Sequence, residues 1–293
     1  MIWKLRTREL DVSRGLIMGV INVTPDSFSD GGVHLDPDRA IAAGLEMAKA
    51  GADLVDVGGE STRPGALPVN ADEETGRVVP VVTGLVESGL VVSIDTSKPE
   101  VASAALEAGA EIVNDVTAAG SERMVGVLAG SGAGVVLMHM KGTPRTMQQD
   151  PVYGDVVAEV AGFLEERAGQ IIGAGVDPAS VSIDPGIGFG KTANHNLQLI
   201  DGLPRLVESG YPVVLGTSRK AFLGRITGID DPGARDGVTA VTTALGFERG
   251  ARVFRVHDVV SSRAALSLAA AIVSHGTWHE WSQDSSPGDS PGS

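Results

Sequence analysis

The sequence predicts an α/β protein, a (β/α)8 TIM barrel with an N-terminal β-hairpin. Eight short runs rich in Val, Ile and Leu alternate along the chain with helical patterns that close on Gly. The runs are nearly continuously apolar, as expected of parallel strands that are covered on both faces. Polar residues end nearly every run. In a barrel the strand ends form one face, and that face carries the chemistry.

Residues 1–12 predict the hairpin. Trp3, Leu5 and Thr7 alternate with basic residues, and Leu10 and Val12 resume the alternation after a turn. A period of two places the apolar side chains on one face of each strand. We therefore expect two antiparallel strands that lead into the first buried strand.

Each buried run has the length of a strand and is followed by a polar or Gly-rich loop. The eight predicted strands are Leu16–Ile21, Asp53–Val57, Leu90–Ile94, Glu111–Val113, Gly134–Met138, Val181–Ile183, Pro212–Leu215 and Arg252–Val256. Eight βα units in about 260 residues fit a barrel of ordinary size. A doubly wound open sheet is the alternative, but the eight runs show no break between two halves.

Helix-start signals fall between the predicted strands. Each is a capping Asp or a Pro in the first turn, and they stand at Asp36–Pro37, Pro99, Asp155 and Asp258. In the last of these helices we expect Leu266, Ala269 and Ile272 to face the core.

One domain is expected over residues 1–275. From residue 276 to 293 the chain becomes acidic, contains no Lys or Arg, and ends in SQDSSPGDSPGS. Such a composition buries too little apolar surface to fold, so we expect a disordered tail.

Composition and charge exclude several classes of function. The net charge of −14 argues against nucleic acid and anionic membranes as partners, because both bind basic surfaces. The chain contains no Cys, which excludes disulfides and Cys-ligated metal centres. The first residues lack the apolar segment of a signal peptide, and no run approaches the ~18 apolar residues of a membrane span. A cytoplasmic protein is expected.

If the barrel forms, the residues that follow the strands meet at one mouth. They are Asn22, Asp56, Asp95, Asn114 with Asp115, His139, Asp184, Gly216–Lys220, and Arg255 with His257. The carboxylates and amides among them can accept hydrogen bonds from a heterocycle rich in N–H groups. A carboxylate pairs especially well with a guanidine-like edge, since two parallel N–H bonds meet two oxygens.

Cations are expected at the other side of this mouth. Arg255 and His257 are two residues apart on a strand and so point the same way. With Arg63 they would form a clamp for an oxyanion or phosphate. Simpler roles stay open for some of these positions: a lone Asp can cap a helix, His139 can be structural, and Lys191 and Arg219 can be solvated charges.

Several motifs, in order along the chain, resemble those of one family. They are GVINVTPDSFSDGG, DVGGESTRPGA, SIDTSKPEVA, NDVTA, LMHMKGTP, DPGIGFGKT, SRKAFLG and RVHDV. Each is weak alone, but together they make the sequence, from about Gly15 to Val273, similar to the dihydropteroate synthase family, the pterin-binding barrels of folate biosynthesis.

The resemblance implies that 6-hydroxymethyl-7,8-dihydropterin pyrophosphate and 4-aminobenzoate condense to 7,8-dihydropteroate and pyrophosphate. The positions that match the family's pterin site are Asp95, Asn114, Met138, Asp184, Phe189 and Lys220. Those that match its pyrophosphate site are Asn22, Thr62, Arg63, Arg255 and His257. Those that match its 4-aminobenzoate site, where sulfonamides also bind, are Phe28, Pro64, Ser218 and Lys220. The implied catalytic residues are Asp95, Lys220, Arg255 and His257.

By the same resemblance, Asn22 is a ligand of Mg²⁺ and the protein is a homodimer. An aromatic amine is nucleophilic at pH 7 without a general base, so we expect a dissociative displacement in which the site stabilises charge. Residues 23–32 are expected to form a lid hinged at Gly31 and Gly32, and residues 61–69 a second mobile loop.

Two other functions remain as alternatives. A methyltetrahydrofolate methyltransferase shares the pterin-binding barrel, but it has no pyrophosphate to bind. The SRK and RVH motifs and the first loop argue against it, because they fit a pyrophosphate site. A non-catalytic paralogue would bind pterins or a partner enzyme without turnover. The intact motifs weigh against it.

Overall fold

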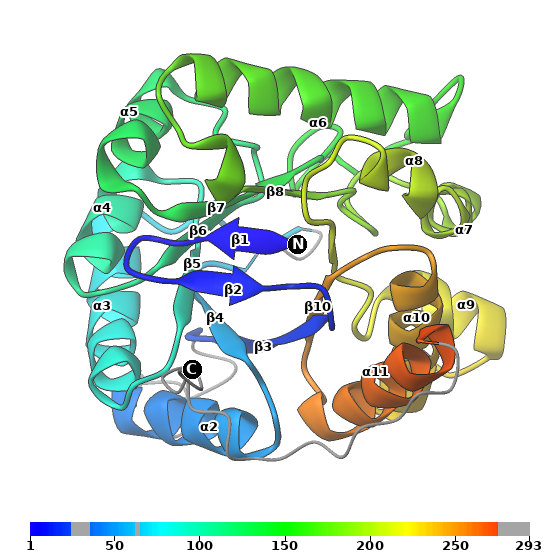
Figure 1. Cartoon of the computed structure of the whole chain (residues 1–293), viewed down its shortest axis with the longest axis horizontal. Coiled ribbons are helices and arrows are strands. Elements are labelled where there is room, and N and C mark those ends of the chain that lie inside the picture. The colour runs from blue at the N-terminus through cyan, green and yellow to red at the C-terminus, as the bar shows by residue number, and fades with distance from the viewer. Residues whose placement is uncertain (25–35, 62–64, 275–293) are drawn as a thin grey trace, which may run out of the picture.

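The computed structural model describes residues 1–24, 36–61 and 65–274, and Figure 1 shows them as strands surrounded by a ring of helices. The predicted lid lies almost wholly outside the described residues, as does the predicted tail. So do Phe28, Thr62, Arg63 and Pro64.

The central sheet has eight parallel strands in the order β8-β7-β6-β5-β4-β3-β10-β9. Their bounds are β3 Leu16–Asn22, β4 Leu54–Gly58, β5 Val92–Asp95, β6 Ile112–Asp115, β7 Gly134–Met138, β8 Val181–Asp184, β9 Val214–Leu215 and β10 Val253–Val256. A parallel bridge between Ile183 and Val213 joins the two end strands, and the Ile183 amide donates to Pro212 O at 3.0 Å. The sheet is therefore a closed barrel, as predicted, and the open-sheet alternative is wrong.

The predicted strands agree with the observed ones to within two residues at each end. Five of the eight strands extend further at their carboxyl ends than predicted, and Asn22, Asp95 and Asp184 are the last paired residues of three of these, β3, β5 and β8. Because they belong to the barrel wall, the backbone at these residues is fixed by the sheet.

The helices follow the strands in sequence and form the outer ring of Figure 1. They are α2 Pro37–Lys49, α3 Ala71–Glu87, α4 Pro99–Glu107, α5 Glu122–Ser131, α6 Val156–Gly173, α7 Ala193–Asp201, α8 Leu203–Val207, α9 Ala221–Thr227, α10 Asp236–Glu248 and α11 Val259–Val273, with 3-10 turns η1 Pro178–Ser180 and η2 Gly233–Arg235. The predicted caps are confirmed: the Asp36, Asp155 and Asp258 side chains each accept from a backbone N–H in the first turn. No helix in the described ranges is long and apolar enough to cross a membrane.

One expected core residue is exposed. Leu266 and Ala269 of α11 are buried, but the Ile272 side chain is 67% exposed. Residues three apart fall about 60° short of a full turn, so two such steps move Ile272 about 120° around the helix from Leu266. Ile272 therefore lies outside the buried stripe.

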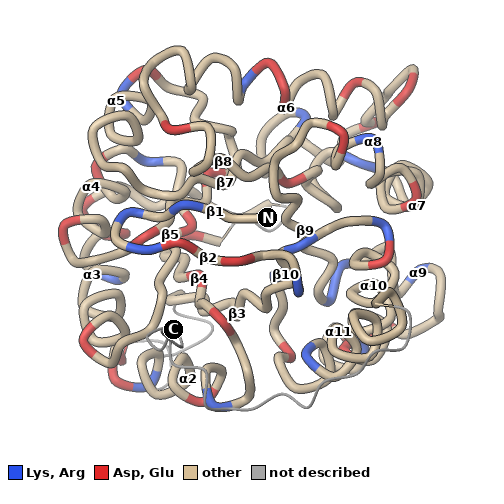
Figure 2. The backbone as a smooth tube through the Cα atoms, in the orientation of Figure 1, with Lys and Arg blue, Asp and Glu red and all other residues tan. Residues whose placement is uncertain are grey.

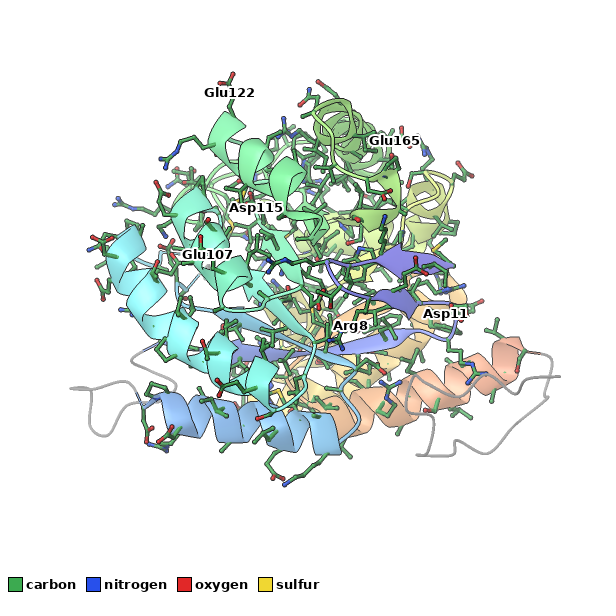
Figure 3. The ribbon with its side chains drawn as sticks, turned by 60° about the vertical axis from the view of Figure 1, so that its left-hand side comes forward. Arg8, Asp11, Glu107, Asp115, Glu122 and Glu165 are labelled. Atoms are coloured by element: carbon green, nitrogen blue, oxygen red, sulfur yellow. The ribbon has the colours of Figure 1, made fainter. Side chains whose placement is uncertain are left out.

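The N-terminal hairpin, β1 Ile2–Lys4 with β2 Glu9–Asp11, closes one end of the barrel. Trp3, Leu5 and Val12 are buried against the first residues of the strands, among them Leu16, Ile112 and Val253. Trp3 Nε1 also donates to Ser180 O at 2.9 Å. Figure 3 shows the hairpin from the side, with Arg8 at its turn and Asp11 at the end of β2. The functional site is thus left to the opposite end.

Acidic and basic residues are interspersed around the ring of helices in the view of Figure 2, rather than gathered on one face.

Candidate active site

The sheet register brings the predicted residues of neighbouring strands side by side at the barrel mouth. Asn22 pairs with Gly58, Gly58 with Asp95, and Asp95 with Asn114. On the far side Met138 pairs with Asp184. Five of the residues expected to bind substrate or metal therefore lie on one continuous rim.

Arg255 of β10 connects two acidic residues across this mouth. Its Nε donates to Asp56 Oδ2 at 2.6 Å, and its Nη2 donates to Asp95 Oδ2 at 2.8 Å. Asn114 Nδ2 donates to the same Asp56 oxygen at 3.0 Å. Arg255 is therefore aligned by two carboxylates at the pterin side of the predicted site, in addition to any contact it makes with pyrophosphate.

The sequence assigns Asp56 no particular partner and shows it only as one of several acceptor carboxylates at the strand ends. Its side chain is fully buried, and Oδ1 has no hydrogen-bond partner among the described residues. The signal that could have identified it is the distant Arg255, because a buried carboxylate needs a cation.

Burial and neighbouring charges shift the pKa values of this group. Burial raises the pKa of Asp95 to about 7, against the lowering effect of Arg255 and with the help of the Asp56 charge. Burial alone would lower the pKa of Arg255, but the attraction of Asp56 and Asp95 outweighs it and raises that pKa. Burial also raises the pKa of Asp184. Asp95 therefore changes its charge near neutral pH, while Arg255 stays cationic.

Lys220 and Phe189 form a second pair at the mouth. The Lys220 ammonium lies 4.0 Å from the centroid of the Phe189 ring, within the range of a cation–π contact. Burial and then the charge of Arg255 lower the pKa of Lys220 to about 8. A Cβ at Gly188 would lie 3.1 Å from Lys220 Cδ, so a glycine there leaves room for this side chain.

Ser218 and His257 are brought together from the segments that follow β9 and β10. Ser218 Oγ lies 2.9 Å from His257 Nδ1, and the His257 amide donates to Ser218 Oγ at 3.1 Å. Arg219, the residue after Ser218, has a left-handed φ of 59°. Its guanidinium makes two hydrogen bonds to Asp236, at 2.8 and 2.7 Å. Arg219 is thus a partnered residue that shapes this loop rather than a solvated charge.

The buried Asp184 joins β8 to its loop, since its Oδ1 accepts from the Gly186 amide at 2.6 Å. Met138 packs here too, because a Cβ at Gly186 would lie 3.3 Å from its Cγ. Lys191, for which a solvated surface charge was one expectation, is only 2% exposed. That expectation is wrong: Lys191 is buried beside His139, whose simpler, structural role fits the contacts described below.

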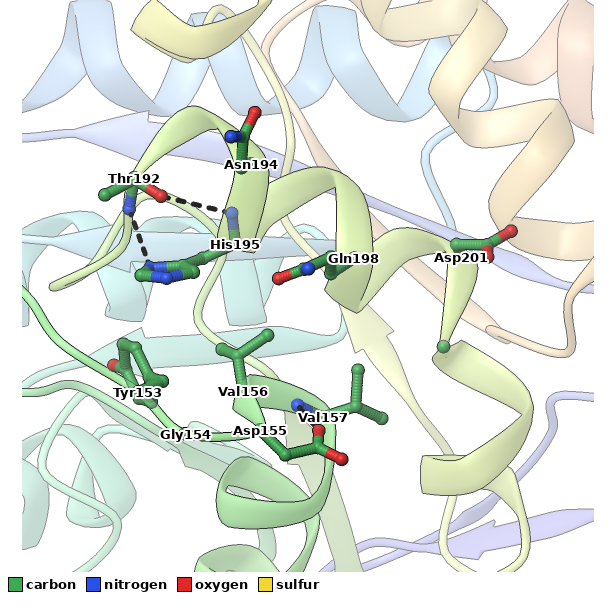
Figure 4. A pocket seen from close by; sticks show the side chains of 11 residues that line it. Tyr153, Gly154, Asp155, Val156, Val157, Thr192, Asn194, His195, Gln198 and Asp201 are labelled. Carbon is green, nitrogen blue, oxygen red and sulfur yellow. Dashed lines mark hydrogen bonds between the residues drawn. The ribbon is translucent and has the colours of Figure 1, made fainter.

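A separate cavity of about 620 Å³ lies between the start of α6 and α7 (Figure 4). Tyr153, Asp155 and His195 are among its lining residues, and none of the predicted site residues is. Within the described ranges no group of three or more His, Asp or Glu residues could hold a metal ion.

Comparisons with known proteins agree with this geometry. A family model described as pterin binding enzyme matches residues 18–257. The dihydropteroate synthase of Mycobacterium leprae (strain TN) is 48% identical over 262 residues, which are 87% of this chain and 92% of the relative.

Solved structures give the same result. Xanthomonas albilineans dihydropteroate synthase with 4-aminobenzoic acid has a TM-score of 0.87 and 46% identity, covering 93% of this chain and 99% of that one. The same enzyme in complex with 7,8-dihydropteroate has a TM-score of 0.84 and 44% identity, covering 92% and 98%. Yersinia pestis dihydropteroate synthase with a sulfonamide drug has a TM-score of 0.89 and 38% identity, covering 94% and 100%. The chain belongs to the pterin-binding enzyme family and, within it, to the dihydropteroate synthases.

Proposed function

We propose that this protein condenses 6-hydroxymethyl-7,8-dihydropterin pyrophosphate with 4-aminobenzoate to give 7,8-dihydropteroate and pyrophosphate. It is a transferase of folate biosynthesis. One observation carries the proposal: acceptor side chains and the cations Lys220 and Arg255 share one barrel mouth, in a chain 46% identical to an enzyme solved with 4-aminobenzoic acid.

The pterin would lie against Asp95, Asn114 and Asp184, with Met138, Phe189 and Lys220 packed near it. Its ring N–H and amino groups are donors, and carboxylate and amide oxygens accept from them. Ionised Asp95 is the form that accepts two such bonds. A bound donor edge would therefore favour the charged carboxylate, against the burial that raises its pKa to about 7.

The reaction breaks the bond between the pterin methylene carbon and the pyrophosphate oxygen and forms a carbon–nitrogen bond to the arylamine, which then loses a proton. We propose that the first bond breaks ahead of the second. Positive charge then develops on the methylene carbon, and the carboxylates of Asp56, Asp95 and Asp184 favour it electrostatically. Asp95, Lys220, Arg255 and His257 are the residues that we assign to catalysis.

The departing pyrophosphate needs positive charge and hydrogen-bond donors. Arg255 and His257 are available for this at the end of β10, and Thr62 and Arg63 are proposed to join them. Because Arg255 already bonds to Asp56 and Asp95, its positive charge would act both on the leaving group and on the carboxylates beside the pterin.

Mg²⁺ is the proposed cofactor. Asn22, the last residue of β3 and half-buried, offers an amide oxygen, which is a hard ligand of the kind this ion takes. The ion commonly keeps one or two protein ligands plus phosphate oxygens and water, so Asn22 fits it without an acidic cluster. When bound, Mg²⁺ would neutralise part of the pyrophosphate charge.

The 4-aminobenzoate would lie beside Ser218 and Lys220, with Phe28 and Pro64 completing its site. Sulfonamides are proposed to compete for the same place, in keeping with the drug complex of the Y. pestis relative.

A pyrophosphate ester carries several charges and does not cross a bilayer unaided, so we place the enzyme in the cytoplasm with its substrate.

A homodimer is proposed through α10 and α11, which lie side by side in Figure 1. Large apolar side chains are exposed on both helices, at Val241 and Leu245 of α10 and at Leu268 and Ile272 of α11. The two residues on each helix are four positions apart, so each helix exposes an apolar stripe, and such stripes favour association with an identical face. Ile272→Glu should shift sedimentation toward the monomer. An unchanged dimer in that variant would argue for another interface.

The decisive experiment mixes purified protein, Mg²⁺, the pterin pyrophosphate and 4-aminobenzoate and measures 7,8-dihydropteroate. No product from verified substrates would reject the proposal. Strong pterin binding without turnover would instead identify a non-catalytic paralogue. A methyltransferase would bind methyltetrahydrofolate and show no requirement for a pyrophosphate.

A further inference from the structure

The buried Lys191 has three hydrogen-bond acceptors and no role in the proposed chemistry. Its Nζ lies 3.0 Å from His139 Nδ1, 3.2 Å from His139 O and 2.9 Å from Phe189 O. An ammonium carries three N–H bonds, and these acceptors match them one for one. The two carbonyl oxygens carry no charge, and the His139 ring is neutral too, because burial and then the charge of Lys191 lower its pKa to about 3.

These acceptors belong to two different loops. His139 directly follows β7, while Phe189 lies in the loop after β8. The loops touch so closely that a Cβ at Gly186, where φ is +67°, would lie 1.9 Å from His139 O. Lys191 therefore ties the Phe189 loop to the end of β7 at a point where only glycine allows the approach.

Three further side chains hold the backbone of the same loop. Asn196 Oδ1 accepts from the Gly188 amide, and Gln148 Nε2 donates to Gly188 O, both at 2.8 Å. Tyr153 donates its hydroxyl to Gly190 O at 2.8 Å. The Tyr153 ring also forms part of the cavity wall in Figure 4. A loop held by side chains at successive residues is preorganised rather than adaptable.

The Phe189 side chain in this loop contacts Lys220, whose Nζ lies 4.0 Å from the centroid of the Phe189 ring. We propose that Lys191, together with His139, is a positioning residue that fixes the Phe189 loop, and through it the Phe189–Lys220 pair, for pterin binding. Lys191 donates to the carbonyl oxygen of Phe189, while the ring of the same residue contacts Lys220. The inference rests on the proposed function and deepens it, because it names a residue outside the substrate contacts that sets their geometry.

The contacts do not require a fixed charge on Lys191. Burial lowers its pKa to about 7, with Asp184 raising it and Lys220 lowering it. A neutral amine can accept from His139 Nδ1–H while its own two N–H groups remain on the two carbonyl oxygens. The His139 tautomer thus exchanges with the charge of Lys191, and the loop stays held in both states.

The test begins with Lys191→Met, which removes the donors and keeps the length of the side chain. The matched control is Lys49→Met, because Lys49 is an exposed lysine at the last residue of α2 that pairs with Glu46 and takes no part in the contacts of the Phe189 loop. Displacement of a loop that contacts the substrate weakens substrate binding by a factor on the order of ten. We expect about that rise in the KM for the pterin pyrophosphate in Lys191→Met and less than a twofold change in the control.

A double-mutant cycle separates positioning from general stability. If Lys191 acts through Phe189, Lys191→Met added to Phe189→Ala should weaken pterin binding no further than Phe189→Ala alone. Additive losses would overturn the proposal. So would a folded Lys191→Met with wild-type KM.

Should Lys191→Met not fold, Lys191→Gln is the second variant. Its side chain is one bond shorter, so its N–H groups do not reach both carbonyl oxygens, and the KM is expected to rise by about threefold. A Gln variant with wild-type KM would overturn the proposal as well. Failure of the wild-type enzyme to form dihydropteroate would reject the proposed function instead, so the two failures are distinguishable.

Discussion

Arg255 donates to both Asp56 and Asp95, which lie 199 and 160 residues away in the chain. One guanidinium thereby joins the ends of three strands at the barrel mouth. Asp95 is subject to two opposed charges, since Arg255 lowers its pKa and Asp56 raises it, while burial brings it to about 7. Replacing Arg255 and replacing Asp56 should therefore shift the pH dependence of the reaction in opposite directions.

Asp56→Asn should lower the pKa of Asp95, because a negative neighbour is removed. If ionised Asp95 is the active form, wild-type kcat/KM falls as the pH drops through about 7. In the variant that fall should occur at lower pH. We also expect a loss of about tenfold at the plateau, because Arg255 is held less firmly. A pH–rate profile checks both, with the exposed Asp72→Asn as the control.

Arg255→Met should have the opposite effect on the acid limb. Loss of the cation raises the pKa of Asp95, so activity should begin to fall at higher pH than in the wild type. Pyrophosphate also loses a donor, and kcat should drop by about a hundredfold or more. Because Arg255 bonds to the carboxylates at the pterin side, the KM for the pterin pyrophosphate should rise too. A profile that keeps its acid limb in place would contradict the charge network.

Removal of Mg²⁺ by a chelator should abolish turnover and leave the fold intact, since Asn22 is the only protein ligand proposed. Asn22→Ala should raise the Mg²⁺ concentration for half-maximal rate by about tenfold. Far-UV circular dichroism before and after chelation tests the fold. Full activity in metal-free buffer would remove Mg²⁺ from the mechanism.

Trp3 should matter for stability and not for catalysis, because it lies at the end of the barrel opposite the site. Trp3→Ala removes a fully buried side chain and should lower the free energy of unfolding by about 3–5 kcal/mol. Trp3→Phe removes the bond to Ser180 O and should cost about 1 kcal/mol. Urea unfolding measures both. The kcat of the folded Phe variant should equal that of the wild type, and a large fall would contradict this separation.

The alternation of eight apolar runs with helix signals was enough to predict the barrel, because the strand periodicity and the caps at Asp36, Asp155 and Asp258 are local properties. The acceptors at the mouth could be predicted for the same reason, since every residue that ends a parallel strand shares one face. Ile272 was placed wrongly because spacing by threes approximates the helical period only over a short distance.

The fold class, the polar rim and the family follow from the amino-acid sequence alone, since each depends on the order of residues along the chain. The partners of the buried charges are known only from the folded chain: Arg255 bonds to Asp56 and Asp95, and Lys191 is buried against His139 and Phe189. Apart from Lys191 and Phe189, which are two positions apart, these contacts join residues 52 to 199 positions apart. Which side chains meet depends on barrel closure and on the cost of burying an unpaired charge, and neither is visible in a local stretch of sequence.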